Sequence, residues 1–75
     1  MCLLDAPQGQ WLKVSALEGG SRLRARFSQY GLFIGDRLRI LRTAPLKGPL
    51  LVEVNGREIA FGRGVAGKII VEVAE

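Results

Sequence analysis

No other segment of this chain restricts the fold as strongly as residues 50–61, LLVEVNGREIAF. Two alternating apolar runs flank Asn55-Gly56, a pair that favours a two-residue type I′ hairpin turn because both positions tolerate positive φ. The resulting register pairs Val52 with Ile59 and places most of the apolar side chains on one face. Residues 50–61 are therefore expected to form a β-hairpin with one buried face.

Three further segments alternate apolar and polar residues with the period of two that indicates half-buried strands. These segments are residues 11–17, 37–44 and 68–73. The side chains that they are expected to turn toward the core are Leu12, Val14, Ala16, Leu38, Ile40, Ile69, Val71 and Val73. Together with the hairpin, they predict five short strands.

A short helix is expected between the first two of the alternating segments. Leu23, Phe27 and Tyr30 recur at the spacing of one helical face. Ser21 stands where an N-cap residue would, and Gly31 fits the left-handed position that ends a helix. A helix of about ten residues is not stable alone, so it must dock on the sheet.

The number and length of these elements indicate the fold class. The chain has 75 residues, which is enough for one domain. Five short strands would leave too many open edges in a flat sheet, and closure into a barrel removes them. We therefore expect an all-β fold, a small SH3-like β-barrel of residues 11–75 with one short helix. Residues 1–10 are expected to be a flexible lead-in, and residues 62–67 a short turn or one helical turn.

The residue types exclude most catalytic chemistry. The sequence contains no histidine, the commonest general base and metal ligand. Its single cysteine, Cys2, forms no internal disulfide and builds no thiolate metal site, which agrees with a reducing compartment. The segment GRGVAG, residues 62–67, lacks the spacing and the Lys-Ser/Thr of a phosphate-binding loop. We expect a protein that is not an enzyme and takes no cofactor.

The hydrophobic segments are short. None approaches the ~18 apolar residues that cross a bilayer. The first ten residues, MCLLDAPQGQ, lack the basic start and long apolar run of a signal peptide. The expected location is the cytoplasm.

The positive charge leaves three interpretations open. The net charge is +4, and eight of the eleven basic residues are arginines. The surface could be simply solvated, could dock on a protein, or could bind nucleic acid, which usually needs exposed aromatic rings beside the basic residues. The candidates for such binding are Arg22, Arg24, Arg26, Arg37 and Arg39 with Trp11, Tyr30 and Phe33. Because the aromatic residues are few, nucleic acid is not expected as a partner.

The hairpin register also places Glu53 opposite Glu58. Like charges at such positions are destabilising unless something offsets them. One interpretation is a weak site for a hard cation, since divalent ions favour carboxylate oxygens. The other is that an arginine of a neighbouring strand, such as Arg39, bridges the two carboxylates.

Three motifs resemble the FeoA family of ferrous iron transport proteins. They are YGLFIGDRLRIL at residues 30–41, APLKGPLLVEVNGREIAF at residues 44–61, and Ala66 followed by KIIVEV at residues 68–73. Two positions depart from the family pattern, where a Leu is usual at Tyr30 and a Pro is common at Ile34. Loss of that proline makes the segment around Ile34 less stiff.

The resemblance implies an SH3-like barrel and a cytosolic accessory role in bacterial ferrous iron uptake. The implied partner is FeoB, the membrane transporter of Fe²⁺ with its own GTP-binding domain, and self-association is a second expectation. The family carries no agreed metal or catalytic residues, so none is transferred to this chain. Two alternatives remain: a small basic barrel that binds nucleic acid, and the SH3-like domain of a metal-dependent regulator standing alone.

Apolar residues outside the strand pattern indicate where a partner would bind. Phe33 and Ile34 lie between two glycines, and Leu46 lies in a loop between prolines. Such residues either form an interaction surface or plug an end of the barrel. Our hypothesis is one docking face built from the segment 31–35 and the loop 45–49. Its expected residues are Tyr30, Leu32, Phe33, Arg37, Pro45, Leu46 and Pro49.

Overall fold

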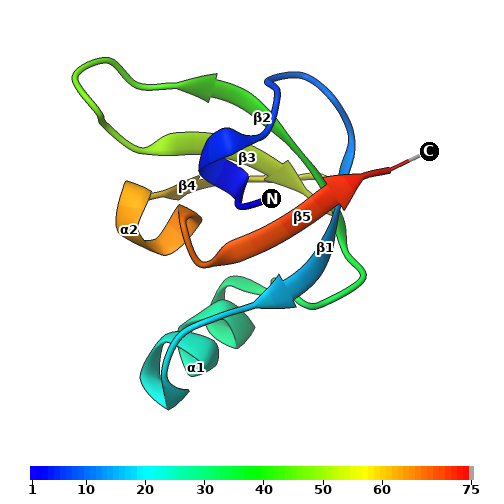
Figure 1. Ribbon diagram of the computed structural model, residues 1–75, viewed down its shortest axis with the longest axis vertical. Coiled ribbons are helices and arrows are strands. Elements are labelled where there is room, and N and C mark those ends of the chain that lie inside the picture. Colours follow the sequence, from blue (N-terminus) through cyan, green and yellow to red (C-terminus); the bar gives the residue numbers. More distant parts are fainter. Residues whose placement is uncertain (75) are drawn as a thin grey trace.

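The computed structural model describes residues 1–74 and contains five strands and three short helical segments (Figure 1). In chain order the elements are η1 (Leu3–Asp5), β1 (Leu12–Leu17), α1 (Ser21–Tyr30), β2 (Arg37–Thr43), β3 (Leu50–Val54), β4 (Arg57–Phe61), α2 (Arg63–Ala66) and β5 (Ile69–Val73). No helix within residues 1–74 is long and apolar enough to cross a membrane.

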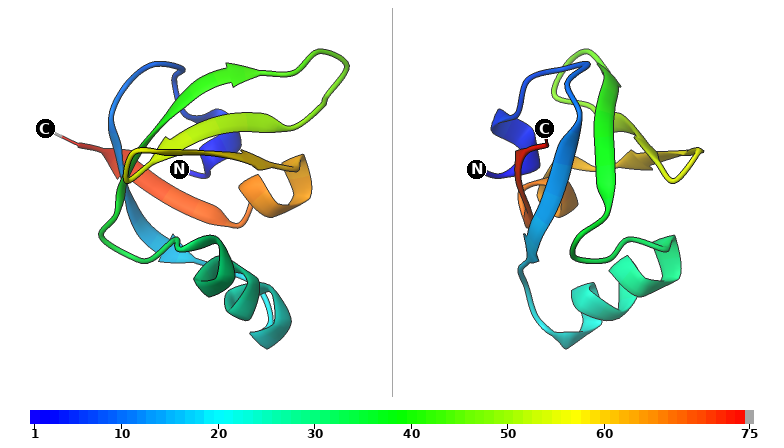
Figure 2. Two further views of the ribbon diagram at one scale, coloured as in Figure 1. Left: turned by 180° about the vertical axis from the view of Figure 1, so that it is seen from behind. Right: turned by 90° about the vertical axis from the view of Figure 1, so that its right-hand side faces the viewer.

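The strands form one antiparallel sheet in the order β4-β3-β2-β1-β5. Figures 1 and 2 show that this sheet curls strongly, and α2 joins its two outermost strands. Register shifts in β2, between Ile40 and Arg42, and in β1, between Val14 and Ala16, contribute to the curvature because bulges bend strands. The fold is the expected SH3-like barrel with one short helix, and α2 is the single helical turn expected at residues 62–67.

The β3–β4 hairpin forms with the expected turn and register. Asn55 and Gly56 have φ angles of 51° and 77°. Val52 pairs with Ile59, as the sequence predicted. The local turn chemistry therefore determines this part of the sheet.

The core lies inside the curled sheet and draws buried side chains from every strand. Its members are Leu3, Leu12, Val14, Phe27, Leu32, Leu38, Ile40, Leu50, Val52, Val54, Phe61, Ala66, Ile69 and Val71. The inward position expected for Val73 is wrong, because its side chain is 46 % exposed. Val73 is the last residue of β5, which is an outermost strand of the sheet.

The first ten residues differ from the loose lead-in expected from the sequence. Leu3, in the helical turn η1, is completely buried in the core. The Val71 N–H donates to the Met1 carbonyl at 2.8 Å, and the Gly9 N–H donates to the Ile40 carbonyl at 2.9 Å. This segment therefore covers part of the outer edge of β5 and belongs to the packed domain.

The helix α1 begins one residue earlier than expected, because Ser21 was predicted to be the N-cap residue. Gly20 is the N-cap, and its carbonyl accepts the Arg24 N–H at 3.0 Å, so Ser21 is already helical and makes no side-chain cap. At the other end Gly31 has φ 77°, and the Leu32 N–H returns to the Phe27 carbonyl at 2.9 Å. This pattern of bonds ends the helix at the expected glycine.

Candidate interaction surface

The segment 31–36, which we call the corner, turns the chain from α1 into β2. The Phe33 N–H donates to the Asp36 carboxylate at 2.9 Å, and the Asp36 N–H donates back to the Phe33 carbonyl at 3.0 Å. These reciprocal bonds close a tight turn, and Gly35 within it has φ 95°. The turn holds Phe33 and Ile34 at its outer side.

Bonds to β1 fix the corner to the barrel. The Gly35 N–H donates to the Val14 carbonyl at 2.8 Å, and the Val14 N–H donates to the Asp36 carbonyl at 2.9 Å. The corner is thus an extension of the sheet. It also presents apolar side chains to solvent, since Phe33 is 53 % exposed and Ile34 is 64 % exposed.

Arg57, at the start of β4, holds the helix end beside the corner. Its Nη2 donates to the Tyr30 carbonyl at 2.9 Å and lies 3.5 Å from the Gly31 carbonyl. These carbonyls belong to the C-terminal end of α1, which carries partial negative charge. Sequence reasoning missed this role of Arg57, because no local signal links it to a glycine 26 residues away.

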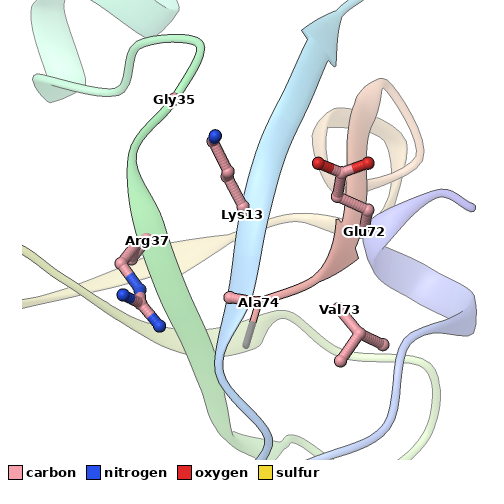
Figure 3. A pocket seen from close by; sticks show the side chains of 6 residues that line it. All are labelled: Lys13, Gly35, Arg37, Glu72, Val73 and Ala74. Carbon is pink, nitrogen blue, oxygen red and sulfur yellow. The ribbon is translucent and has the colours of Figure 1, made fainter.

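A hollow of about 550 Å³ lies beside the corner. Figure 3 shows Lys13 on β1 between Arg37 on β2 and Glu72 on β5. The register explains this row, since Lys13 pairs with Arg37 on one side and with Glu72 on the other. The residues that line the hollow are Lys13, Gly35, Arg37, Glu72, Val73 and Ala74. Lys13 was not among the expected site residues.

The expected docking face is not continuous in the structure. The corner and the loop 45–49 lie at opposite ends of β2 (Figures 1 and 2). The seven residues of β2 span roughly 20 Å. The hypothesis of one docking face that contains both segments is therefore wrong, because they are separated by the length of this strand.

The individual site residues are placed in three different settings. Leu32 is buried in the core, so it is not available to a partner in this structure. Tyr30 is half-buried, and its ring meets the Phe61 ring edge-on at 5.3 Å between centroids. Phe33 and Arg37 are exposed at the corner. The loop residues Pro45, Leu46 and Pro49 are exposed at the far end of β2.

The carboxylate pair occupies the predicted register, with Glu53 opposite Glu58. Arg39 reaches Glu53 from β2, and its Nη2 lies 2.8 Å from the Glu53 Oε1. The Arg39 guanidinium also stacks over the Trp11 ring, 4.8 Å from its centre. A cation bound to Glu53 would have to compete with this arginine, which is the neighbour that the sequence analysis named. Residues 1–74 contain no group of three or more His, Cys, Asp and Glu side chains that could hold a metal ion.

The aromatic candidates for base stacking are scattered. Trp11 is partly covered by Arg39, and Tyr30 packs on Phe61. Phe33 is 53 % exposed at the corner, and Trp11 is 38 % exposed beside Arg39. Nucleic-acid binding by a small barrel normally uses several stacking rings on one face, and the described residues do not form such a face.

Fold and surface together define a small SH3-like domain with exposed apolar residues at two ends of one strand. The profile of the FeoA domain matches residues 1–73. The chain therefore belongs to the FeoA family.

Individual relatives agree with this assignment. A protein of Methanocaldococcus jannaschii described as "Putative Fe(2+) transport protein A" is 36 % identical over 73 residues, which cover 97 % of this chain and 87 % of the relative. The solution structure of FeoA from Chlorobium tepidum is 31 % identical, with a TM-score of 0.89, and the match covers all of this chain and 71 % of that one. Iron(II) transport protein A from Clostridium thermocellum is 27 % identical with a TM-score of 0.90, over 97 % of this chain and 45 % of the other.

The same fold occurs within larger proteins. The manganese regulator SloR has a TM-score of 0.87 at 23 % identity, and this chain spans 34 % of its length. At this level of identity the likeness concerns the fold alone.

Proposed function

We propose that this chain is a non-catalytic accessory protein of ferrous iron uptake that acts in the cytoplasm by docking on the cytosolic region of a FeoB-type Fe²⁺ transporter. Membership of the FeoA family and the names of the relatives support the role in iron transport. The partner follows from what the family resemblance implies. The proposal assigns no catalytic step and no cofactor to this chain.

The corner is the observation that carries a docking role. Its backbone is fixed by reciprocal hydrogen bonds and by bonds to β1, so little conformational freedom remains to be lost on binding. Phe33 and Ile34 stand exposed on this rigid support, as anchor residues of interfaces do. Lys13 and Arg37 beside them add positive charge that would steer the corner toward an acidic surface.

The test is direct titration of the purified transporter region with the full chain. Phe33→Ala should weaken binding at least about tenfold, because an exposed aromatic anchor loses its contacts with the partner. Its thermal unfolding midpoint should stay near that of the wild type, since the Phe33 side chain is half exposed. Arg37→Ala should lower the association rate and reduce its dependence on salt.

Lys68→Ala is the matched control for Arg37→Ala, because Lys68 is an exposed cation in the turn that precedes β5. It should leave the association rate unchanged. Absence of binding by the wild type would contradict the proposed function. Strong binding of DNA or RNA that falls steeply with salt would instead favour the nucleic-acid alternative.

A further inference from the structure

The turn at residues 44–49, which joins β2 to β3, holds two consecutive non-glycine residues in the left-handed region. Leu46 has φ 58° and Lys47 has φ 59°. The Gly48 N–H donates to the Pro45 carbonyl at 3.1 Å, so Leu46 and Lys47 are the central residues of a four-residue turn. Positive φ at both central positions is the pattern of a type I′ turn.

The same molecule contains a second turn of this pattern, made from the residues that it favours. Asn55 and Gly56 occupy its central positions with φ 51° and 77°. Leucine and lysine are disfavoured there because the Cβ atom comes too close to the following carbonyl oxygen. Leu46 and Lys47 therefore leave the β2–β3 turn less stable than an Asn-Gly pair would make it.

Packing of the Leu46 side chain does not offset the cost of this backbone conformation, since the side chain is 99 % exposed. Strained residues of this kind concentrate where a protein binds. Figures 1 and 2 show the turn extending away from the sheet, at the end of β2 opposite the corner. A strained backbone that presents a fully exposed leucine indicates a binding anchor.

The turn is also rigid. The Ala44 N–H donates to the Pro49 carbonyl at 2.9 Å, and the two prolines restrict their own φ angles. Gly48 packs so closely that a Cβ placed on it would lie 2.8 Å from the Ala44 Cβ. A rigid support lowers the entropy lost on binding and suits a pocket of fixed shape, whereas a fluid membrane surface does not require one.

The charges around the turn indicate the chemistry of the partner. No acidic residue occurs between Ile40 and Val52, and the segment carries Arg42 and Lys47. Both cations are exposed. A complementary surface would surround an apolar pocket with carboxylates.

We infer that Leu46 is an anchor that enters an apolar pocket with an acidic rim on a partner protein. The inference rests on the proposed function, because it places this pocket on the cytosolic region of the FeoB-type transporter. The turn is thus a second docking element, separate from the corner. A single chain could contact the partner at both ends of β2.

The experiment measures binding and unfolding temperature on the same variants of the full chain, with the purified transporter region as probe. Leu46→Asn removes the apolar anchor and supplies a residue that tolerates the left-handed region. We expect its affinity to fall at least about tenfold, while its thermal unfolding midpoint rises by about 2–4 °C. Loss of binding with a gain of stability separates an anchor from a structural residue.

Lys47→Gly is the matched control, because it relieves the same backbone strain and leaves Leu46 in place. Its unfolding midpoint should rise as well, and its affinity should fall by less than that of Leu46→Asn, because it removes one rim charge and keeps the apolar anchor. Leu46→Ala, which keeps the strain, should weaken binding as Leu46→Asn does.

Equal binding by the wild type, Leu46→Asn and Leu46→Ala would overturn the inference and leave the proposed function standing. Absence of binding by the wild type would overturn both. The chain could instead bind vesicles of phosphatidylcholine and phosphatidylserine in a Leu46-dependent way and not bind the transporter region. That result would contradict a pocket on a partner protein and would indicate that Leu46 contacts a membrane surface.

Discussion

At the scale of single residues, Arg57 connects the sheet to the helix α1. Its guanidinium donates to the Tyr30 carbonyl at the C-terminal end of the helix, and no acidic side chain among residues 1–74 pairs with it. The helix end therefore takes the place of a carboxylate, because its last carbonyls are unpaired within the helix and carry partial negative charge. This contact also explains why the space beside Gly31 is filled by the Arg57 side chain.

Arg57→Ala should destabilise the protein by about 1 kcal/mol, the usual order for a charge-assisted bond to a helix end at the surface. The thermal unfolding midpoint should fall by about 4–8 °C in a domain of this size. Arg24→Ala is the control, since Arg24 is an exposed arginine of α1 whose side chain forms no bond to the other residues of 1–74. Equal midpoints for the two variants would show that the Arg57 contact contributes nothing to stability.

At the scale of elements, the end of α1 depends on the backbone of Gly31. Its φ of 77° is disfavoured for any residue with a Cβ, and a Cβ placed there would also meet the Arg57 guanidinium. Gly31→Ala should therefore cost about 1–2 kcal/mol from the backbone alone. Urea denaturation, monitored by circular dichroism, would measure this loss in the free energy of unfolding.

Gly64→Ala provides the opposite case within the same chain. Gly64 lies in α2 with open space around its Cβ position and without a positive φ. Alanine there should leave stability unchanged or raise it by less than about 1 kcal/mol. A Gly31→Ala variant as stable as Gly64→Ala would contradict the assigned role of Gly31.

The sequence predicted those elements whose residues have a strong conformational preference. It did not predict how the elements are placed relative to one another. The Asn55-Gly56 pair defined its hairpin because those residues favour the conformation that the turn needs. The turn at Leu46 and Lys47 carried no such signal, because these residues oppose the conformation they adopt. The corner and this turn both contain exposed apolar residues, yet only the course of β2 shows that they lie apart.

At the scale of the whole molecule, the first ten residues complete the barrel. The apolar pattern of this segment is too short to predict an element, since it amounts to Leu3 and Leu4 before Asp5. Its contribution depends instead on where it packs. Leu3 enters the core, and the bonds between Met1 and Val71 lie along the edge of β5. A sheet edge covered in this way is protected from pairing with other chains.

Leu3→Ala should destabilise the protein by about 2–5 kcal/mol, because it leaves a cavity in the core. In a domain of 75 residues this is a large part of the total free energy of unfolding. Leu46→Ala is the matched control, since it removes the same atoms from a side chain that is 99 % exposed, and it should leave the urea midpoint unchanged. The two leucines thus distinguish a segment that closes the core from a turn whose leucine lies in solvent. Equal stability of both variants would mean that the first residues do not pack as a part of the barrel, and the domain would then begin at β1.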